Sequence, residues 1–184
     1  MQDDAVTTQD DHTPMTAASD VQRSRVYDAE HLVHRLFDRS AEYPLIEIAG
    51  SRLTLPVERR FASIESVQSY VDRVLALGWV RATWARAAVQ VVVRGRAGDS
   101  QAHYERAGAV MAVPTGRGSR SNSAWAMREL VVLHELSHHL ADGPEVAHGP
   151  EFVDRMLTAV DGIIGPEAAL LLRVTLLDNG VRLA

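Results

Sequence analysis

Apolar residues in the first half of the chain recur at helical spacing in residues 27–43 and 63–79. Those that share a face in the first segment are Leu32, Val33, Leu36 and Phe37. Those that share a face in the second are Ile64, Val67, Val71, Val74 and Leu75. Because positions three and four apart lie on the same side of an α-helix, both segments are predicted to be amphipathic helices. Asp28 is the predicted N-cap of the first helix, and Gly78 is the predicted end of the second.

Strand-like patterns occupy the segments between and after these helices. Residues 45–56 predict two short strands joined by a Gly–Ser turn. Residues 87–96 are rich in β-branched valine, which favours a strand. Residues 101–114 predict two more strands around a turn at residues 106–108.

Three helices are predicted in the last third of the chain. The first covers about residues 123–141, with Ser123 as its N-cap and Gly143–Pro144 as its stop. The second and third open near Pro150 and Pro166, because proline suits the first turn of a helix. The order helix, short strands, helix, strands and three helices indicates an α+β fold.

The composition separates an acidic start from a balanced body. Residues 1–24 are polar with almost no large apolar side chains, so we expect a disordered acidic tail before one domain of residues 25–184. Five aspartates in residues 1–20 account for the net charge of −5. The body has no basic stripe, so nucleic-acid binding is not indicated. No apolar run reaches the roughly 18 residues of a membrane span, and no signal-peptide pattern opens the chain. We therefore expect a cytoplasmic protein without a membrane partner.

The candidate chemistry lies in residues 131–152, which contain four of the eight histidines. Residues 134–138, HELSH, fit the pattern H-E-x-x-H. On a helix His134 and His138 differ by about 40° in angle, so both imidazoles can reach one metal ion. Glu135 points about 100° round from His134, beside the water that the ion activates, where a general base belongs. The flanks are apolar, and three buried polar side chains without partners would be costly.

The third ligand is less clearly defined by the pattern. The chain has no cysteine, so a transition metal must be bound by histidine and carboxylate. A catalytic zinc site has three protein ligands and one open position. His148 is favoured, because the break at Gly143–Pro144 leaves enough chain to return it before the next helix, which Phe152 can anchor in the core. The alternative is a carboxylate, with Glu145, Glu151 and Asp154 as the contenders.

The string HELSHH…HGPEF resembles the active-site pattern of SprT-like zinc metalloproteases, over about residues 102–152. From about Tyr27 to the C-terminus, with AHYERAGAVMAVP and WAMRELVVLHELSHHL before the loop, the chain resembles a family of metallohydrolases from mycobacteria and other actinobacteria. The absence of lysine suits that origin. The resemblance implies a zincin-like fold, a small mixed sheet packed on helices. It also implies one Zn²⁺ per chain on His134, His138 and His148, with Glu135 as the catalytic base.

The chain departs from known zincin patterns in two respects. The metzincin spacing H-E-x-x-H-x-x-G-x-x-H is absent. No zinc ribbon or DNA-binding appendage is visible, so the role of some SprT relatives in repairing DNA–protein crosslinks is not carried over.

Further residues are expected around the metal. In zincins the strand before the active helix usually forms the sheet edge beside the substrate, and residues 108–114 are expected to take this place and pair with an extended peptide. A plain role in the core is equally expected for the side chains of this segment. A hydrolase also needs a hydrogen-bond donor for the developing oxyanion. Tyr104 leads His103 and Arg128 as the candidate, although no spacing singles it out.

The other histidines are assigned no catalytic role. His139 is rotated off the metal face, so we expect it to support a ligand or to be exposed. His31 and His34 are expected to be solvated surface residues rather than a weak metal site. The basic segment of residues 115–123 is expected to be a plain loop rather than a contact for substrate or nucleic acid.

These patterns together predict a zinc-dependent hydrolase acting on a peptide or protein substrate, a metallopeptidase. One alternative is a non-peptide amidohydrolase, because H-E-x-x-H defines the chemistry better than the substrate. Another is a binding or regulatory module with a structural zinc ion. A closed site with a fourth side chain on the metal would favour the module, and an open fourth position would favour an enzyme.

Overall fold

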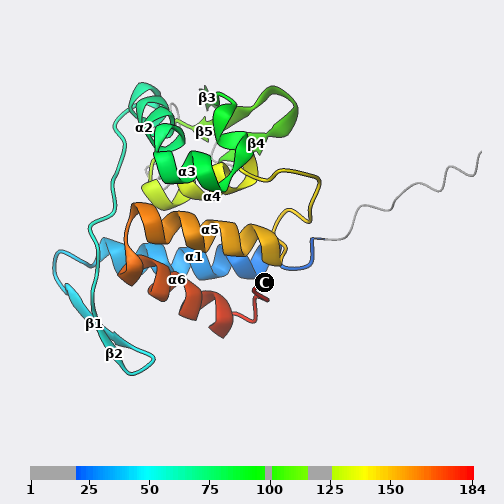
Figure 1. Cartoon of the computed structure of the whole chain (residues 1–184). Coiled ribbons are helices and arrows are strands. Elements are labelled where there is room, and N and C mark those ends of the chain that lie inside the picture. The colour runs from blue at the N-terminus through cyan, green and yellow to red at the C-terminus, as the bar shows by residue number, and fades with distance from the viewer. Residues whose placement is uncertain (1–19, 98–100, 116–125) are drawn as a thin grey trace, which may run out of the picture.

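The computed structural model describes residues 20–97, 101–115 and 126–184. The predictions for residues 1–19, for Ser123 and for nearly all of the basic loop fall outside these residues. In the described part the elements follow the predicted order, and the fold is α+β with six α-helices and two small sheets (Figure 1).

Four helices form the layers below the main sheet in Figure 1. Helix α4 (Glu129–His139) packs against α5 (Pro150–Ile163), and α6 (Pro166–Asp178) packs against both α5 and α1 (Arg23–Asp38). As predicted, α5 and α6 begin with proline. Helix α4 lies between these helices and the sheet, which is why nearly all of its residues are buried. No helix in the described residues is long and apolar enough to cross a membrane.

The main sheet has three strands, in the order β3 (Val92–Arg96), β5 (Val110–Pro114) and β4 (His103–Glu105). Strand β5 pairs in parallel with β3 and antiparallel with β4. The prediction that residues 108–114 form the edge of the sheet is therefore wrong. A short 3₁₀ turn, η2 (Arg106–Gly108), folds β4 back along one side of β5, and β3 covers the other side. The edge strand on this side is β4.

A separate two-stranded hairpin projects from the body of the molecule (Figure 1). It consists of β1 (Leu45–Ile48) and β2 (Ser51–Thr54), the two strands predicted for residues 45–56, which pair antiparallel. The predicted Gly–Ser turn is shifted by one residue, because Ser51 is already the first residue of β2. Ala49 and Gly50 form the turn with φ angles of 48° and 76°. Two successive left-handed residues match the twist that a two-residue hairpin turn requires.

Helix α1 begins earlier than predicted. Its first residue is Arg23 and its N-cap position is Gln22, so Asp28 lies inside the helix. Gln22 is buried, and its side-chain amide donates to the carbonyl of His148 at 3.0 Å. Residues 20–24 therefore belong to the folded body, and the predicted tail boundary at residue 24 is wrong.

The second predicted helix, residues 63–79, is divided in the structure between two helices. Helix α2 (Ile64–Ala76) starts at Ser63, which forms a capping box with the backbone and side chain three residues on. Gly78 does not end a helix; it opens the short α3 (Gly78–Thr83), which η1 (Ala85–Ala88) follows.

Helix α4 is shorter than the predicted residues 123–141 and begins at Glu129. Its start is fixed by a buried ion pair. The guanidinium of Arg128 donates to Oε2 of Glu58 at 2.7 Å, and Oε1 of Glu58 accepts from the backbone N–H of Leu130 at 3.0 Å. The carboxylate thus satisfies a helix N–H that has no partner within the helix.

Candidate metal centre

Three histidines from two elements bring their Nε2 atoms together. Helix α4 carries His134 and His138 one turn apart, and the loop before α5 carries His148. Nε2 of His134 lies 3.2 Å from Nε2 of His138 and 3.3 Å from Nε2 of His148. All three ligand atoms lie within 4.8 Å of one another. This separation fits one ion with bonds of about 2.0–2.1 Å, so the group could hold a metal ion.

Carboxylates bind the second nitrogen of two of these rings. Oε1 of Glu30, on α1, lies 2.6 Å from Nδ1 of His134. Oδ2 of Asp20 lies 2.6 Å from Nδ1 of His148. Because a carboxylate accepts hydrogen bonds, each Nδ1 carries the proton and each Nε2 keeps a free lone pair. The rings are thus oriented as metal ligands, and this donor set fits zinc.

The three rings differ in how readily they take up a proton. Burial, together with the neighbouring His134 and His148, lowers the pKa of His138 to about 2. Burial also lowers the pKa of His148, although the hydrogen bond to Asp20 opposes this. Burial acts in the same direction on His134, but the carboxylate of Glu30 outweighs it, so the pKa of His134 is raised. A metal ion binds neutral imidazole, and the lowered pKa values of His138 and His148 favour that form.

A buried phenylalanine packs against the rings of the three histidines. Phe152 on α5 is fully buried, as predicted. The centroid of its ring lies 4.9 Å from that of His134, 4.3 Å from that of His138 and 5.0 Å from that of His148. The side chain of Phe152 thus packs against all three candidate ligands from helix α5.

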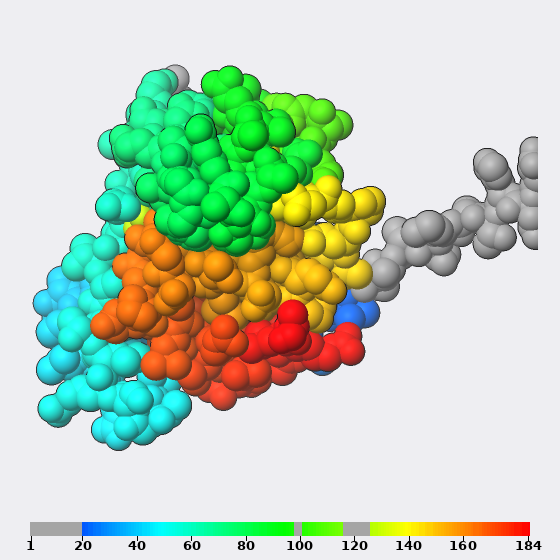
Figure 2. All heavy atoms as spheres, viewed as in Figure 1, coloured from blue at the N-terminus to red at the C-terminus, as the bar shows by residue number. Residues whose placement is uncertain are grey.

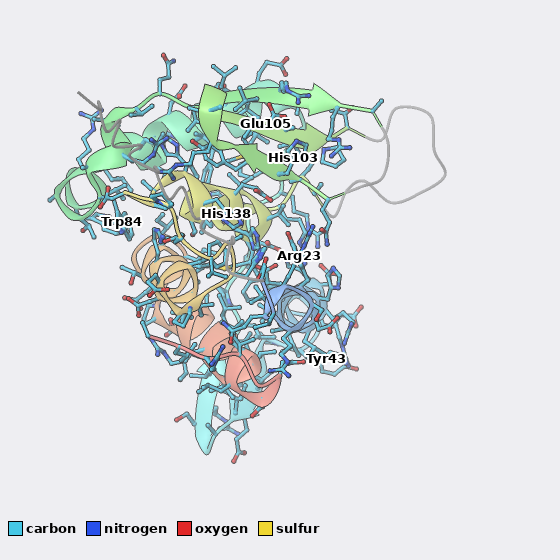
Figure 3. All side chains as sticks on the ribbon, turned by 90° about the vertical axis from the view of Figure 1, so that its right-hand side faces the viewer. Arg23, Tyr43, Trp84, His103, Glu105 and His138 are labelled. Carbon is cyan, nitrogen blue, oxygen red and sulfur yellow. The ribbon has the colours of Figure 1, made fainter. Side chains whose placement is uncertain are left out.

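A cleft of about 640 Å³ borders His138 and His148, and Glu135 lies in its wall. Helix α1, strand β4, helix α4 and the His148 loop supply most of the lining. Figure 2 shows this loop beside the start of α1 at the surface. In Figure 3, Arg23 and His138 lie between α1 and the sheet, where His103 and Glu105 are labelled.

The environment of Glu135 suits proton transfer. Burial raises the pKa of its carboxyl to about 7, while the charge of His134 and the backbone of Tyr104 oppose the shift. A group whose pKa lies near the working pH can both accept and return a proton. The structure therefore places a candidate general base beside the candidate metal ligands.

The carboxylates considered as third ligands lie away from the three Nε2 atoms. Glu145 forms a bidentate ion pair with Arg155, with Nη2 and Oε1 at 2.6 Å. Glu151 and Asp154 are exposed on α5 and line a different hollow. His148 takes the place that the spacing favoured.

His139 is buried where α4 meets β4 and η1. Its Nδ1 lies 2.8 Å from the hydroxyl of Tyr104, and its Nε2 lies 3.0 Å from the carbonyl of Arg86. It is not a ligand, as expected, and it is not exposed. The hydroxyl of Tyr104 also accepts from Arg86 at 3.1 Å. A role for Tyr104 as oxyanion donor stays a prediction, with its hydroxyl already engaged by two partners.

The other two candidate donors are also engaged. Nε2 of His103 lies 3.0 Å from a carboxylate oxygen of Glu105, and its Nδ1 lies 3.0 Å from the guanidinium of Arg96. Arg128 is bound to Glu58 at the start of α4.

The two histidines of α1 lie in different surroundings. His31 is exposed, as predicted, but His34 is buried and its Nε2 has no hydrogen-bond partner in the described residues. His34 lies one turn after Glu30 on the same buried face of the helix. Burial lowers the pKa of His34 to about 4, and the charge of Arg128 adds to the effect. The prediction of a solvated surface residue is wrong for His34.

Three residues of the centre carried no motif that would mark them in the sequence. Asp20 and Glu30 hold two of the ligand rings, and Tyr27 lies against them. One signal was present: Glu30 falls within the buried stripe of α1. A charged residue on the apolar face of a helix needs a partner, and here that partner is His134.

Comparisons of the chain with protein-family models, curated proteins and solved structures found no match. The function must therefore be argued from the site itself.

Proposed function

We propose that this protein is a zinc-dependent hydrolase that cleaves peptide bonds, with His134, His138 and His148 as ligands and Glu135 as general base. The observation that carries the proposal is a group of three imidazoles within 4.8 Å of one another, of which His138 and His148 line a cleft together with the buried carboxylate of Glu135. Within the described residues no fourth side chain joins this group. That favours an open coordination position, as catalytic zinc sites have, over a closed structural site.

The edge strand favours a peptide over another amide substrate. One side of β4 pairs with β5, and the residues of β4 line the cleft beside Glu135. An extended peptide can add to a free strand edge through its backbone, which positions the scissile bond along the strand. An edge strand above an H-E-x-x-H helix, together with the SprT-like pattern, supports a zincin-like fold.

The chain's own residues would divide the reaction between them. Zinc, when bound, supplies Lewis acidity that polarises the scissile carbonyl and acidifies a water molecule. Glu135 accepts the proton of the attacking water and later delivers it to the leaving amine. Glu30 and Asp20 keep His134 and His148 in the tautomer that binds the ion.

Metal analysis of the full chain tests the centre. We expect about one zinc ion per chain, and its loss in the His134→Ala/His138→Ala double variant. His31→Ala removes an exposed histidine outside the centre and should keep the ion. Protein that is zinc-free and equally stable with and without added zinc would overturn the proposal.

Substitution of the base tests the reaction. Glu135→Gln should keep zinc and lose about 10²–10⁴-fold in peptide hydrolysis, the usual contribution of a positioned general base. Glu151→Gln changes an exposed carboxylate of α5 and should leave the rate unchanged. New protein N-termini in cells that overproduce the wild type, but not Glu135→Gln, would supply the substrate. Cleavage of small amides without any new protein N-termini would favour an amidohydrolase instead.

A further inference from the structure

Tyr27 lies on α1, one turn before Glu30, and faces the candidate ligands. Its ring stacks on that of His134, with centroids 5.2 Å apart and an interplanar angle of 24°. The centroid of the His148 ring lies 5.3 Å away on a tilted plane. Tyr27 is half-buried and lines the cleft together with Glu135.

Tyr27 and Phe152 occupy different sides of the three histidines. Phe152 is fully buried and contacts all three rings, so it marks the closed side. Tyr27 contacts only His134 and His148, and it borders the cleft. Arg23 covers the ring of Tyr27, with its guanidinium carbon 5.7 Å from the centroid. The ring thus contacts both a candidate ligand and a cation that lines the cleft.

Hydrolysis of a peptide bond needs a hydrogen-bond donor beside the candidate metal centre. When water adds to a carbonyl, negative charge develops on the carbonyl oxygen, and a fixed O–H or N–H group aimed at it lowers the barrier. Two tyrosines line the cleft. The hydroxyl of Tyr104 is engaged by His139 and Arg86, which leaves Tyr27 as the tyrosine that packs directly on a candidate ligand.

We propose that the hydroxyl of Tyr27 donates a hydrogen bond to the oxyanion formed during hydrolysis. This inference rests on the proposed function. The water oxygen bonds to the carbonyl carbon, its proton passes to Glu135, and the carbonyl π electrons move onto the oxygen that Tyr27 contacts. When the C–N bond breaks, the pair on that oxygen reforms the carbonyl and the amine takes the proton from Glu135. Tyr27 keeps its own proton throughout.

Tyr27→Phe is the test, because it removes the hydroxyl and keeps the stacked ring. With the peptide substrate of the wild type, we expect kcat to fall about 10²–10³-fold, the usual effect of losing one oxyanion donor. KM, zinc content and thermal stability should stay as in the wild type. Tyr43 is exposed to solvent, so Tyr43→Phe is the matched control.

Binding of a peptide phosphonate gives a readout that does not depend on turnover. Its tetrahedral anion resembles the transition state, so Tyr27→Phe should weaken its affinity in calorimetry by about the factor lost from kcat/KM. Binding of the uncleaved peptide to Glu135→Gln should not change when Tyr27→Phe is added.

The outcomes separate the two proposals. A zinc-loaded wild type that cleaves no peptide and binds no phosphonate would overturn the proposed function, and this inference with it. An active wild type whose Tyr27→Phe variant is equally fast, or changes in KM alone, would overturn only the inference. A large loss of kcat in Tyr104→Phe, with none in Tyr27→Phe, would return the role to Tyr104.

Discussion

Two buried carboxylates meet the same helix in contrasting ways. At the start of α4, Glu58 binds Arg128 and the backbone N–H of Leu130, and every contact is internal to the protein. Further along α4, Glu30 binds only one nitrogen of His134, at 2.6 Å, and the other nitrogen of that ring meets two more histidines. The Glu58 carboxylate thus has all of its hydrogen-bond partners within the protein, whereas the Glu30–His134 pair leaves Nε2 of His134 free to bind a metal ion.

A buried carboxylate therefore stabilises the fold at the start of α4, and another orients a candidate metal ligand further along the same helix. A buried ion pair whose hydrogen bonds are all satisfied resists rearrangement, because either charge alone would be costly to bury. A carboxylate on a histidine instead selects which nitrogen holds the proton. Arg128 also donates to the carbonyl of His34, at 3.3 Å, so the two regions touch across α1.

Breaking the Glu58–Arg128 ion pair should have the largest effect on the stability of the protein. Glu58→Ala leaves the buried guanidinium of Arg128 with only the half-exposed Asp38, 3.0 Å away, as a carboxylate partner. We expect a loss of about 3 kcal/mol in the free energy of unfolding, the lower end for breaking a buried ion pair. Arg94→Gln instead removes an ion pair to Glu105 in which both side chains are exposed, at 48% and 39%. That change should cost far less, because solvent screens an exposed pair. Urea denaturation compares the two, and equal losses would show that burial does not distinguish them.

Breaking the second pair should affect the metal more than the fold. Glu30→Gln keeps the shape of the side chain and removes the charge that fixes the ring of His134. We expect zinc affinity to fall about 10–100-fold, the usual effect of removing such a partner. A chelator competition titration measures it, with Glu47→Gln on the hairpin as control. Unchanged affinity would mean that the Glu30 carboxylate does not orient the ligand.

The contrast also explains what the sequence could and could not reveal. His134, Glu135 and His138 were recognisable because their spacing is local to one helix, and His148 followed from a helix break and a short return. Glu30 and Asp20 lie 104 and 128 positions from their histidines, so no local pattern links them. The central place of β5 was missed for the same reason, because pairing with β3 depends on a non-local contact.

His34, between the two carboxylate pairs, should make the protein sensitive to acid. Its pKa of about 4 lies below the ordinary 6.5, so the unfolded chain binds its proton at higher pH than the folded one. The stability that neutral His34 contributes is therefore present above pH 6.5 and is lost as the pH falls to about 4. His34→Leu should reduce the difference between unfolding free energies at pH 6.5 and 4.5 by about 2 kcal/mol. His31→Leu is the exposed control, and an equal pH response in His34→Leu and wild type would contradict the assignment.

The smallest effect is expected at the second ligand carboxylate, Asp20. It binds Nδ1 of His148 at the same 2.6 Å as Glu30 binds His134, but its side chain is 24% exposed against 7% for Glu30. Solvent weakens the interaction of a charge, so the more exposed carboxylate of Asp20 should contribute less to the orientation of its ring. We therefore expect zinc affinity in Asp20→Asn to fall by no more than about tenfold, the lower end for such partners. The same chelator titration shows which of the two substitutions, Asp20→Asn or Glu30→Gln, weakens zinc binding more. A larger loss in Asp20→Asn than in Glu30→Gln would mean that the loop of His148, rather than helix α4, limits how well the ion is held.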